Sequence, residues 1–129
     1  MRFMSIVKAN KASEAGEMPS PKMMEAIGKL AEEGIKSGVI LDTGGLLPSS
    51  LGARVSVAGG KITVKDGPFT EAKELVGGYA IMQVRSKEEA VELGKKFMPV
   101  HLAGLGSSYE GELEVRQMFD PGDCAAPHS

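Results

Sequence analysis

The sequence predicts an α+β fold of the ferredoxin-like, split β-α-β type, in which an antiparallel sheet carries two helices on one face. Three observations support this prediction. Segments with a hydrophobic period of two alternate with segments of period 3.6, in the order strand, helix, strand, hairpin, strand, helix, strand. Both helical segments begin at a serine cap. The chain has 129 residues, which is enough for one hydrophobic core but not two.

The first strand and first helix have clear local signals. Alternation from Phe3 to Lys8 predicts a strand, and the aperiodic residues 9–19 predict a loop that is either mobile or a lid. Ser20 is a helix N-cap and Pro21 suits the first helical position, while Gly38 is expected to end the helix in a left-handed conformation. The apolar residues of its inner face are Met23, Met24, Ile27, Leu30, Ala31 and Ile35.

A hairpin and a tight corner are expected in the middle of the chain. After a strand at Val39–Leu41 and an irregular, glycine-rich stretch, two alternating segments flank Gly59 and Gly60, which is typical of a β-hairpin with one solvated face. Arg54, Ser56, Lys61, Thr63 and Lys65 form its polar set. The hairpin leads into Asp66-Gly67-Pro68-Phe69, a rigid corner that we expect Phe69 to anchor in the core.

The last third of the sequence predicts a central strand at Tyr79–Val84, a helix and a closing strand. Gly77 and Gly78 indicate close approach to the backbone, by a ligand or by another segment of the chain. Ser86 and Glu89 form a capping box, and Pro99 is expected to limit the helix. The closing strand is Glu112–Phe119, with Leu113, Val115 and Phe119 inward. Residues 1–119 therefore form one domain, and 120–129 a loose tail.

Composition excludes several classes of function. The net charge is −2 and the basic residues are scattered, which argues against a nucleic-acid partner. Cys124 is the only cysteine, and no clustered ligand set predicts a metal site. Neither a nucleotide-binding motif nor a long apolar run is present, so we expect no cofactor, no membrane contact and a cytoplasmic location.

The predicted sheet leaves one face without helices. Because several strands have apolar residues on both sides, one copy would expose a larger patch than monomers usually tolerate. We therefore expect two copies to pack sheet against sheet as a homodimer.

From Asp66-Gly67-Pro68-Phe69 through Gly77-Gly78-Tyr79 and the helix from Ser86 to Phe97, the chain resembles the YCII-related family, in its DGPF-motif branch. The resemblance covers roughly residues 1–119 and implies a ferredoxin-like fold that dimerises into an α+β barrel. It also implies a bacterial protein of unassigned function. Some relatives are enzymes that act on small cyclic or aromatic molecules through a His/Asp pair, but the helix from Pro21 to Lys36 contains no histidine.

Two residues are candidates for acid/base catalysis. If the fold brings Asp66 and His101 into one cavity, the aspartate can orient the imidazole, which then moves a proton near neutral pH. Alternatively, Asp66 caps its own turn and His101 is a solvated loop residue. The candidate ligand-binding residues are Asp42, Tyr79, Arg116 and Lys73, each with a structural alternative: a turn, a strand position, an ion pair with Glu114 or Glu71, and a solvated pair with Glu74.

Two functions remain open. One is a small homodimeric protein that binds a small organic molecule near the DGPF corner, with acid/base chemistry on it. The other is a non-catalytic interaction or regulatory module in which the corner only turns the chain. The sequence therefore leaves open whether the protein is an enzyme.

Overall fold

The protein was analysed as a computed structural model that describes residues 1–17, 19–70, 74–105 and 111–120, with the side chains of 102–105 excepted. A four-stranded antiparallel sheet has the order β2-β5-β1-β6. Its strands are β1 (Arg2–Lys8), β2 (Ile40–Gly45), β5 (Val76–Gln83) and β6 (Leu113–Gln117). This order confirms the predicted ferredoxin-like α+β fold.

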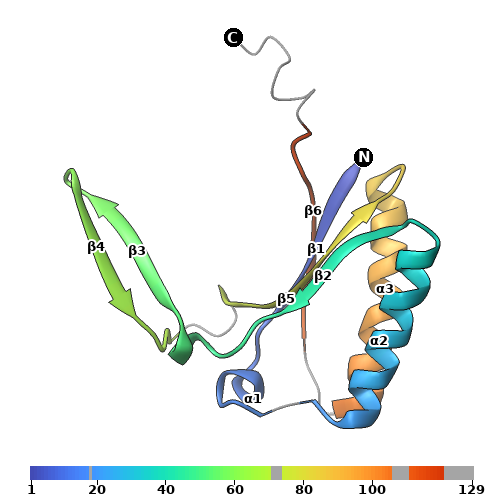
Figure 1. Ribbon diagram of the computed structural model, residues 1–129, viewed down its shortest axis with the longest axis horizontal. Helices are drawn as coiled ribbons and strands as arrows, with labels where there is room; N and C mark the ends of the chain where they lie inside the picture. Colours follow the sequence, from blue (N-terminus) through green and yellow to red (C-terminus); the bar gives the residue numbers. More distant parts are fainter. Residues whose placement is uncertain (18, 71–73, 106–110, 121–129) are drawn as a thin grey trace.

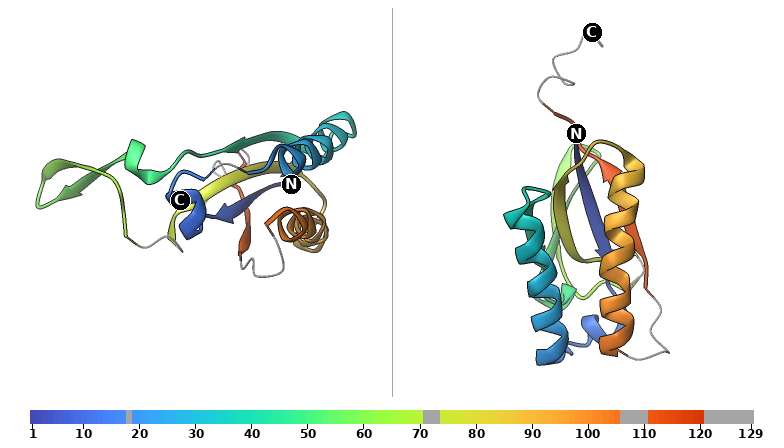
Figure 2. Two further views of the ribbon diagram at one scale, coloured as in Figure 1. Left: turned by 90° about the horizontal axis from the view of Figure 1, so that it is seen from below. Right: turned by 90° about the vertical axis from the view of Figure 1, so that its right-hand side faces the viewer.

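Two long helices, α2 (Pro21–Lys36) and α3 (Lys87–Leu105), lie side by side on one face of this sheet (Figure 2). Ser20 caps α2 by accepting a hydrogen bond from the Met23 N–H at 3.1 Å, as predicted. Gly38 follows the helix with φ +81°, which is the expected left-handed residue. Ser86 caps α3 in the same way, through the Glu89 N–H at 3.2 Å.

The hydrophobic core lies between the helices and the sheet. Its buried members are Phe3, Met82, Val84 and Ala90, with Val39, Leu93 and Val115 packed against them. The Met82 side chain is fully buried, whereas its strand neighbour Ile81 is only half-buried. This alternation shows which side of each strand faces the helices.

The opposite, open face of the sheet carries a mixed set of side chains. Strand pairing places Met4 beside Ile81 and Ile6 beside Tyr79, all on the face that lacks helices. Lys8 and Arg116 flank Glu114 on this face, with nitrogen–oxygen distances of 3.3 and 3.6 Å. We call this surface the open face. Met4, Ile6, Ile81 and the Tyr79 ring make part of it apolar, and the ion-paired Lys8, Glu114 and Arg116 lie at its border.

Strands β3 (Ala53–Ala58) and β4 (Lys61–Asp66) form the predicted hairpin as a separate two-stranded sheet. Gly59 and Gly60 occupy its turn with φ +57° and +76°, which is the backbone that a tight hairpin turn requires. The hairpin projects from the domain on the side opposite the helices (Figure 1). Every residue of both strands is exposed, so in the single chain both faces of the hairpin are solvated and not just the expected polar one.

Four other expectations also need correction. The predicted loop at 9–19 contains a short helix, α1 (Lys11–Glu14), because the Asn10 side chain and Ser13 form a reciprocal cap. β2 extends through Gly45, because Asp42 to Gly45 pair with β5 where an irregular stretch was expected. Helix α3 continues through Pro99 to Leu105, because the preference against a helical residue before proline is a tendency and not a rule. Met24, Ile35 and Phe119 were expected inward and are 51, 54 and 75% exposed.

Candidate pocket at the DGPF corner

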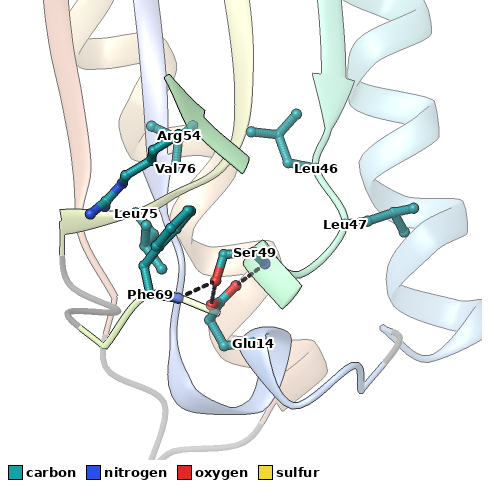
Figure 3. Close-up of a pocket in the computed structure, with 8 residues that line it drawn as sticks. All are labelled: Glu14, Leu46, Leu47, Ser49, Arg54, Phe69, Leu75 and Val76. Carbon is teal, nitrogen blue, oxygen red and sulfur yellow. Dashed lines mark hydrogen bonds between the residues drawn. The ribbon is translucent and has the colours of Figure 1, made fainter. Parts of the chain in front are cut away.

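A pocket of about 200 Å³ lies beside the DGPF corner, at the foot of the hairpin. Eight residues from five segments line it (Figure 3): Glu14, Leu46, Leu47, Ser49, Arg54, Phe69, Leu75 and Val76. Five of the eight side chains are apolar, and the other three supply a carboxylate, a hydroxyl and a guanidinium. The pocket is therefore an apolar recess with a small number of polar groups, which is the usual composition of a small-molecule site.

Ser49 connects three segments at the floor of this pocket. It begins the 3-10 turn η1 (Ser49–Leu51) and donates its N–H to Glu14 Oε2 at 2.8 Å. Its hydroxyl donates to the other Glu14 oxygen and accepts from the Phe69 N–H at 3.1 Å (Figure 3). Helix α1, the turn and the DGPF corner are thus held together by one glutamate and one serine.

The hydrogen bonds from Ser49 lower the pKa of Glu14, first through the hydroxyl and second through the backbone N–H. The carboxylate is therefore ionised at neutral pH. An ionised carboxylate with two donors already bound to it is suited to holding structure or to repelling anions, and not to donating a proton.

Gly67 of the corner lies against the backbone of this turn. A Cβ at position 67 would lie 1.8 Å from the Ser49 carbonyl oxygen, a distance that no side chain tolerates. The Gly67 N–H also donates to the Gly52 carbonyl at 3.0 Å. The glycine of the motif is therefore needed for close approach between two backbone segments.

Arg54 and Phe69 stack against each other at the rim of the pocket. The Arg54 guanidinium carbon lies 3.9 Å from the centre of the Phe69 ring, which is a cation–π stack. Among the described residues no carboxylate is within ion-pair distance of Arg54. Phe69 is half-buried and lines the pocket, so the expectation that it anchors the core is wrong.

The two predicted catalytic residues lie on separate elements of the single chain. Asp66 is the exposed last residue of β4, paired in register with Ala53 at the foot of the hairpin. His101 lies within α3, where its Nδ1 is 3.0 Å from the Phe97 carbonyl oxygen. Figures 1 and 2 both show the hairpin and α3 on opposite sides of the sheet. One chain therefore does not bring this pair together.

Two predicted ligand-binding residues, Asp42 and Tyr79, meet on the open face. The Tyr79 hydroxyl lies 3.4 Å from one Asp42 oxygen, and the other oxygen accepts from the Thr43 N–H at 2.9 Å. The Tyr79 ring lies over Gly44, where an added Cβ would be 2.9 Å from the ring edge. Asp42 thus accepts hydrogen bonds from two neighbours, and Gly44, which has no side chain, leaves room for the tyrosine ring.

The other two candidates for ligand binding are Arg116 and Lys73. Arg116 is exposed on the open face and pairs with Glu114, the intrachain alternative considered from the sequence. Lys73 lies outside the described residues. In the predicted tail, Asp120 pairs with Arg2 at 2.8 Å, and 121–129 also lie outside the described residues.

Sequence reasoning missed most of the pocket, including Glu14, Ser49 and Arg54 as ligand candidates. Glu14 and Ser49 are 35 positions apart and no local pattern connects them. The Asn10–Ser13 cap was the available signal for α1, and it would have placed Glu14 on an ordered element. Gly77 and Gly78 were correctly associated with close approach: added Cβ atoms would lie 3.3 Å from the Ala9 Cα and 3.1 Å from the Gly44 oxygen.

No metal-ligating group of three or more His, Cys, Asp or Glu residues occurs in the part of the chain that is described. Within the same ranges, no helix combines the length and the apolar character needed to cross a bilayer.

Comparisons with solved structures and with family models each found a match. In the solved structures, a match with TM-score 0.48 and 17% identity covers 95% of this chain and 97% of the other. That protein is 5-chloro-2-hydroxyhydroquinone dehydrochlorinase from Burkholderia phenoliruptrix, in complex with 2,5-dihydroxybenzoquinone. No curated protein sequence matches. The family model of the YCII-related domain matches residues 1–110, and the chain therefore belongs to the YCII-related domain family.

Proposed function

We propose that this protein binds a small, single-ring organic carboxylate in the pocket beside the DGPF corner. The observation that carries the proposal is the Arg54 guanidinium, which stacks on Phe69 at the rim of an apolar recess and has no carboxylate partner among the described residues. A guanidinium binds a carboxylate through two parallel hydrogen bonds, and the apolar walls suit a ring.

The size of the pocket limits the ligand. Its volume is about 200 Å³, and an apolar cavity of about 150 Å³ is sufficient for benzene. One ring with a short acidic substituent therefore fills the recess, whereas a nucleotide or a multi-ring compound would extend out of its open side.

The charge of Glu14 determines which end of the ligand enters the pocket first. Its carboxylate is ionised and lies with Ser49 among the half-buried lining residues, and these two form the floor, whereas the exposed Arg54 lies at the rim. A ligand carboxylate is attracted to the rim and repelled from the floor, so the ring enters first.

The protein acts as a homodimer in this proposal, with two open faces packed together. Support comes from the apolar residues Met4, Ile6, Tyr79 and Ile81, which lie on the face that the helices leave uncovered. In such a dimer, Asp42, Tyr79 and Arg116 line the space between the sheets. Acid/base chemistry by Asp66 or His101 then requires the second copy, because one chain keeps the two residues apart.

The test is a thermal-shift screen with benzoate and other single-ring carboxylates, and with benzamide as the uncharged counterpart of benzoate. At least one carboxylate should raise the midpoint of the wild-type protein, because only a ligand of the folded state can do so. Benzamide should have little effect. Arg54→Gln should abolish the shift, whereas Lys61→Gln, a cation at the far end of the same hairpin, should retain it.

Equal stabilisation of wild-type and Arg54→Gln protein would place the ligand elsewhere. If none of the carboxylates raises the midpoint, the binding function is contradicted and the non-catalytic module is favoured. A specific observation supports that second candidate: Ser49, the Phe69 N–H and Gly67 all make contacts that hold the corner itself together.

A further inference from the structure

The hairpin β3–β4 has one apolar face and one polar face. Register pairs Val55 with Val64 and Val57 with Ile62, so four β-branched side chains lie together on one side. Arg54, Ser56, Lys61, Thr63 and Lys65 occupy the other side. The apolar four are 66–72% exposed, which makes this a continuous uncovered apolar surface.

The chain's own domain does not cover this surface. Arg54 points from the polar side onto Phe69, so the polar side of the hairpin faces the DGPF corner and the apolar side faces away from it. An isolated two-stranded hairpin is at best marginally stable in water. A ribbon of this length with four exposed β-branched residues therefore requires another surface to pack against.

The direction of the hairpin indicates where that surface is. Figures 1 and 2 show it projecting on the side of the sheet opposite the helices, which is the side of the open face. A second copy packed against the open face would lie in the space beside the hairpin. The hairpin is thus continuous with the proposed dimer interface.

The distribution of charge along the chain also favours a second copy as the surface on which the hairpin packs. Residues 53–66 contain Arg54, Lys61 and Lys65 against Asp66, a charge of +2, so the rest of a chain with a total of −2 carries −4. A cationic arm and an anionic body attract each other between copies.

We propose that the hairpin is an intersubunit arm whose apolar face, Val55, Val57, Ile62 and Val64, packs on a second copy of this chain. This inference rests on the homodimer of the proposed function and adds a second contact region to it. Because Arg54 and Phe69 lie at the foot of the arm, docking of the arm also holds the rim of the ligand pocket in place.

The test measures self-association by sedimentation velocity over a range of protein concentrations. The variant Val57→Thr/Ile62→Thr keeps β-branched side chains, and hence strand preference, while making the apolar face polar. Val57→Lys is a stronger change at the same place, and Ser56→Lys is its matched control on the adjacent, opposite-facing position. Dimer dissociation should become at least tenfold more favourable in the first two variants and stay within twofold in the control.

A second measurement needs no substitution. Amide hydrogen exchange in residues 53–66 of the wild-type protein should slow as the concentration rises through the dimer dissociation constant. Unchanged exchange there, or a Val57→Lys dimer as stable as the wild type, overturns the arm but leaves the sheet-to-sheet dimer intact. A wild-type protein that is monomeric throughout overturns both, and a monomer that Val57→Lys destabilises shows that the arm folds onto its own chain.

Discussion

Glu14 and Ser49 are 35 residues apart in sequence, and the carboxylate of the first accepts both the N–H and the hydroxyl of the second. Through the same hydroxyl, which accepts the Phe69 N–H, this pair fixes the DGPF corner to helix α1. The geometry of the pocket therefore depends on a contact between segments that have no motif in common.

Replacing Glu14 with Gln should lower the thermal midpoint, since the amide keeps only one acceptor oxygen for two donors. The effect should depend on pH. Because the pKa of Glu14 is lowered in the folded state, its carboxylate contributes stability above its unfolded pKa, near 4.5. That contribution is lost as the pH falls through the lower, folded-state value.

Urea unfolding of both proteins between pH 3 and 7 would measure this effect. The difference in unfolding free energy should be constant near neutral pH and should shrink below about 4.5. Glu17→Gln, which replaces an exposed glutamate of the same segment, is the matched control. A pH-independent difference for Glu14→Gln would contradict the assigned role of its charge.

Gly67→Ala should destabilise the fold by about 1–3 kcal/mol, because the new methyl group overlaps the Ser49 carbonyl and forces backbone movement. Gly52→Ala is a matched control at the end of the adjacent turn η1, since its Cβ would meet that same oxygen at an ordinary 3.5 Å. Chemical denaturation would compare the two. Equal costs for both variants would show that the close approach at Gly67 is unimportant.

The stack of Arg54 on Phe69 should contribute a coupling energy of about 0.5–1 kcal/mol, the usual range for an exposed cation–π pair. A double-mutant cycle with Arg54→Gln and Phe69→Leu, measured by urea unfolding, isolates this pairwise energy. Additive single-variant effects would indicate that the two side chains do not interact in solution.

Met82→Ala should cost about 2–5 kcal/mol, because the fully buried side chain leaves a cavity between the sheet and α3. Met24→Ala removes the same atoms from a side chain that is 51% exposed, and should change the free energy of unfolding by less than about 0.5 kcal/mol. Similar costs at both positions would place the core elsewhere.

The fold could be predicted from sequence because its signals are local. The Ser20 and Ser86 caps, the left-handed Gly38 and the turn glycines at 59 and 60 each depend on neighbours within a few residues. The family relationship supported the same fold. At Pro99, where a local preference alone predicted the end of α3, the prediction failed.

The pocket was largely beyond sequence reasoning, because its residues come from five segments that only the fold brings together. The corner itself was recognised through Gly67 and Phe69, but the reason for the glycine is the Ser49 carbonyl, which no pattern indicates. The pairing of Asp66 with His101 was suggested by residue type alone, and the sheet lies between the elements that carry them. A sequence can contain few residues capable of acid/base chemistry, and those residues can still lie far apart in the structure.

The most direct test of ligand binding at the DGPF corner is an amide-resolved NMR titration with benzoate, or with whichever carboxylate the thermal screen favours. The Ser49 and Phe69 amide signals should shift with saturation, while those of Ile81 and Glu114 on the open face stay in place. Shifts confined to the open face, or an unchanged spectrum at millimolar ligand, would contradict the account.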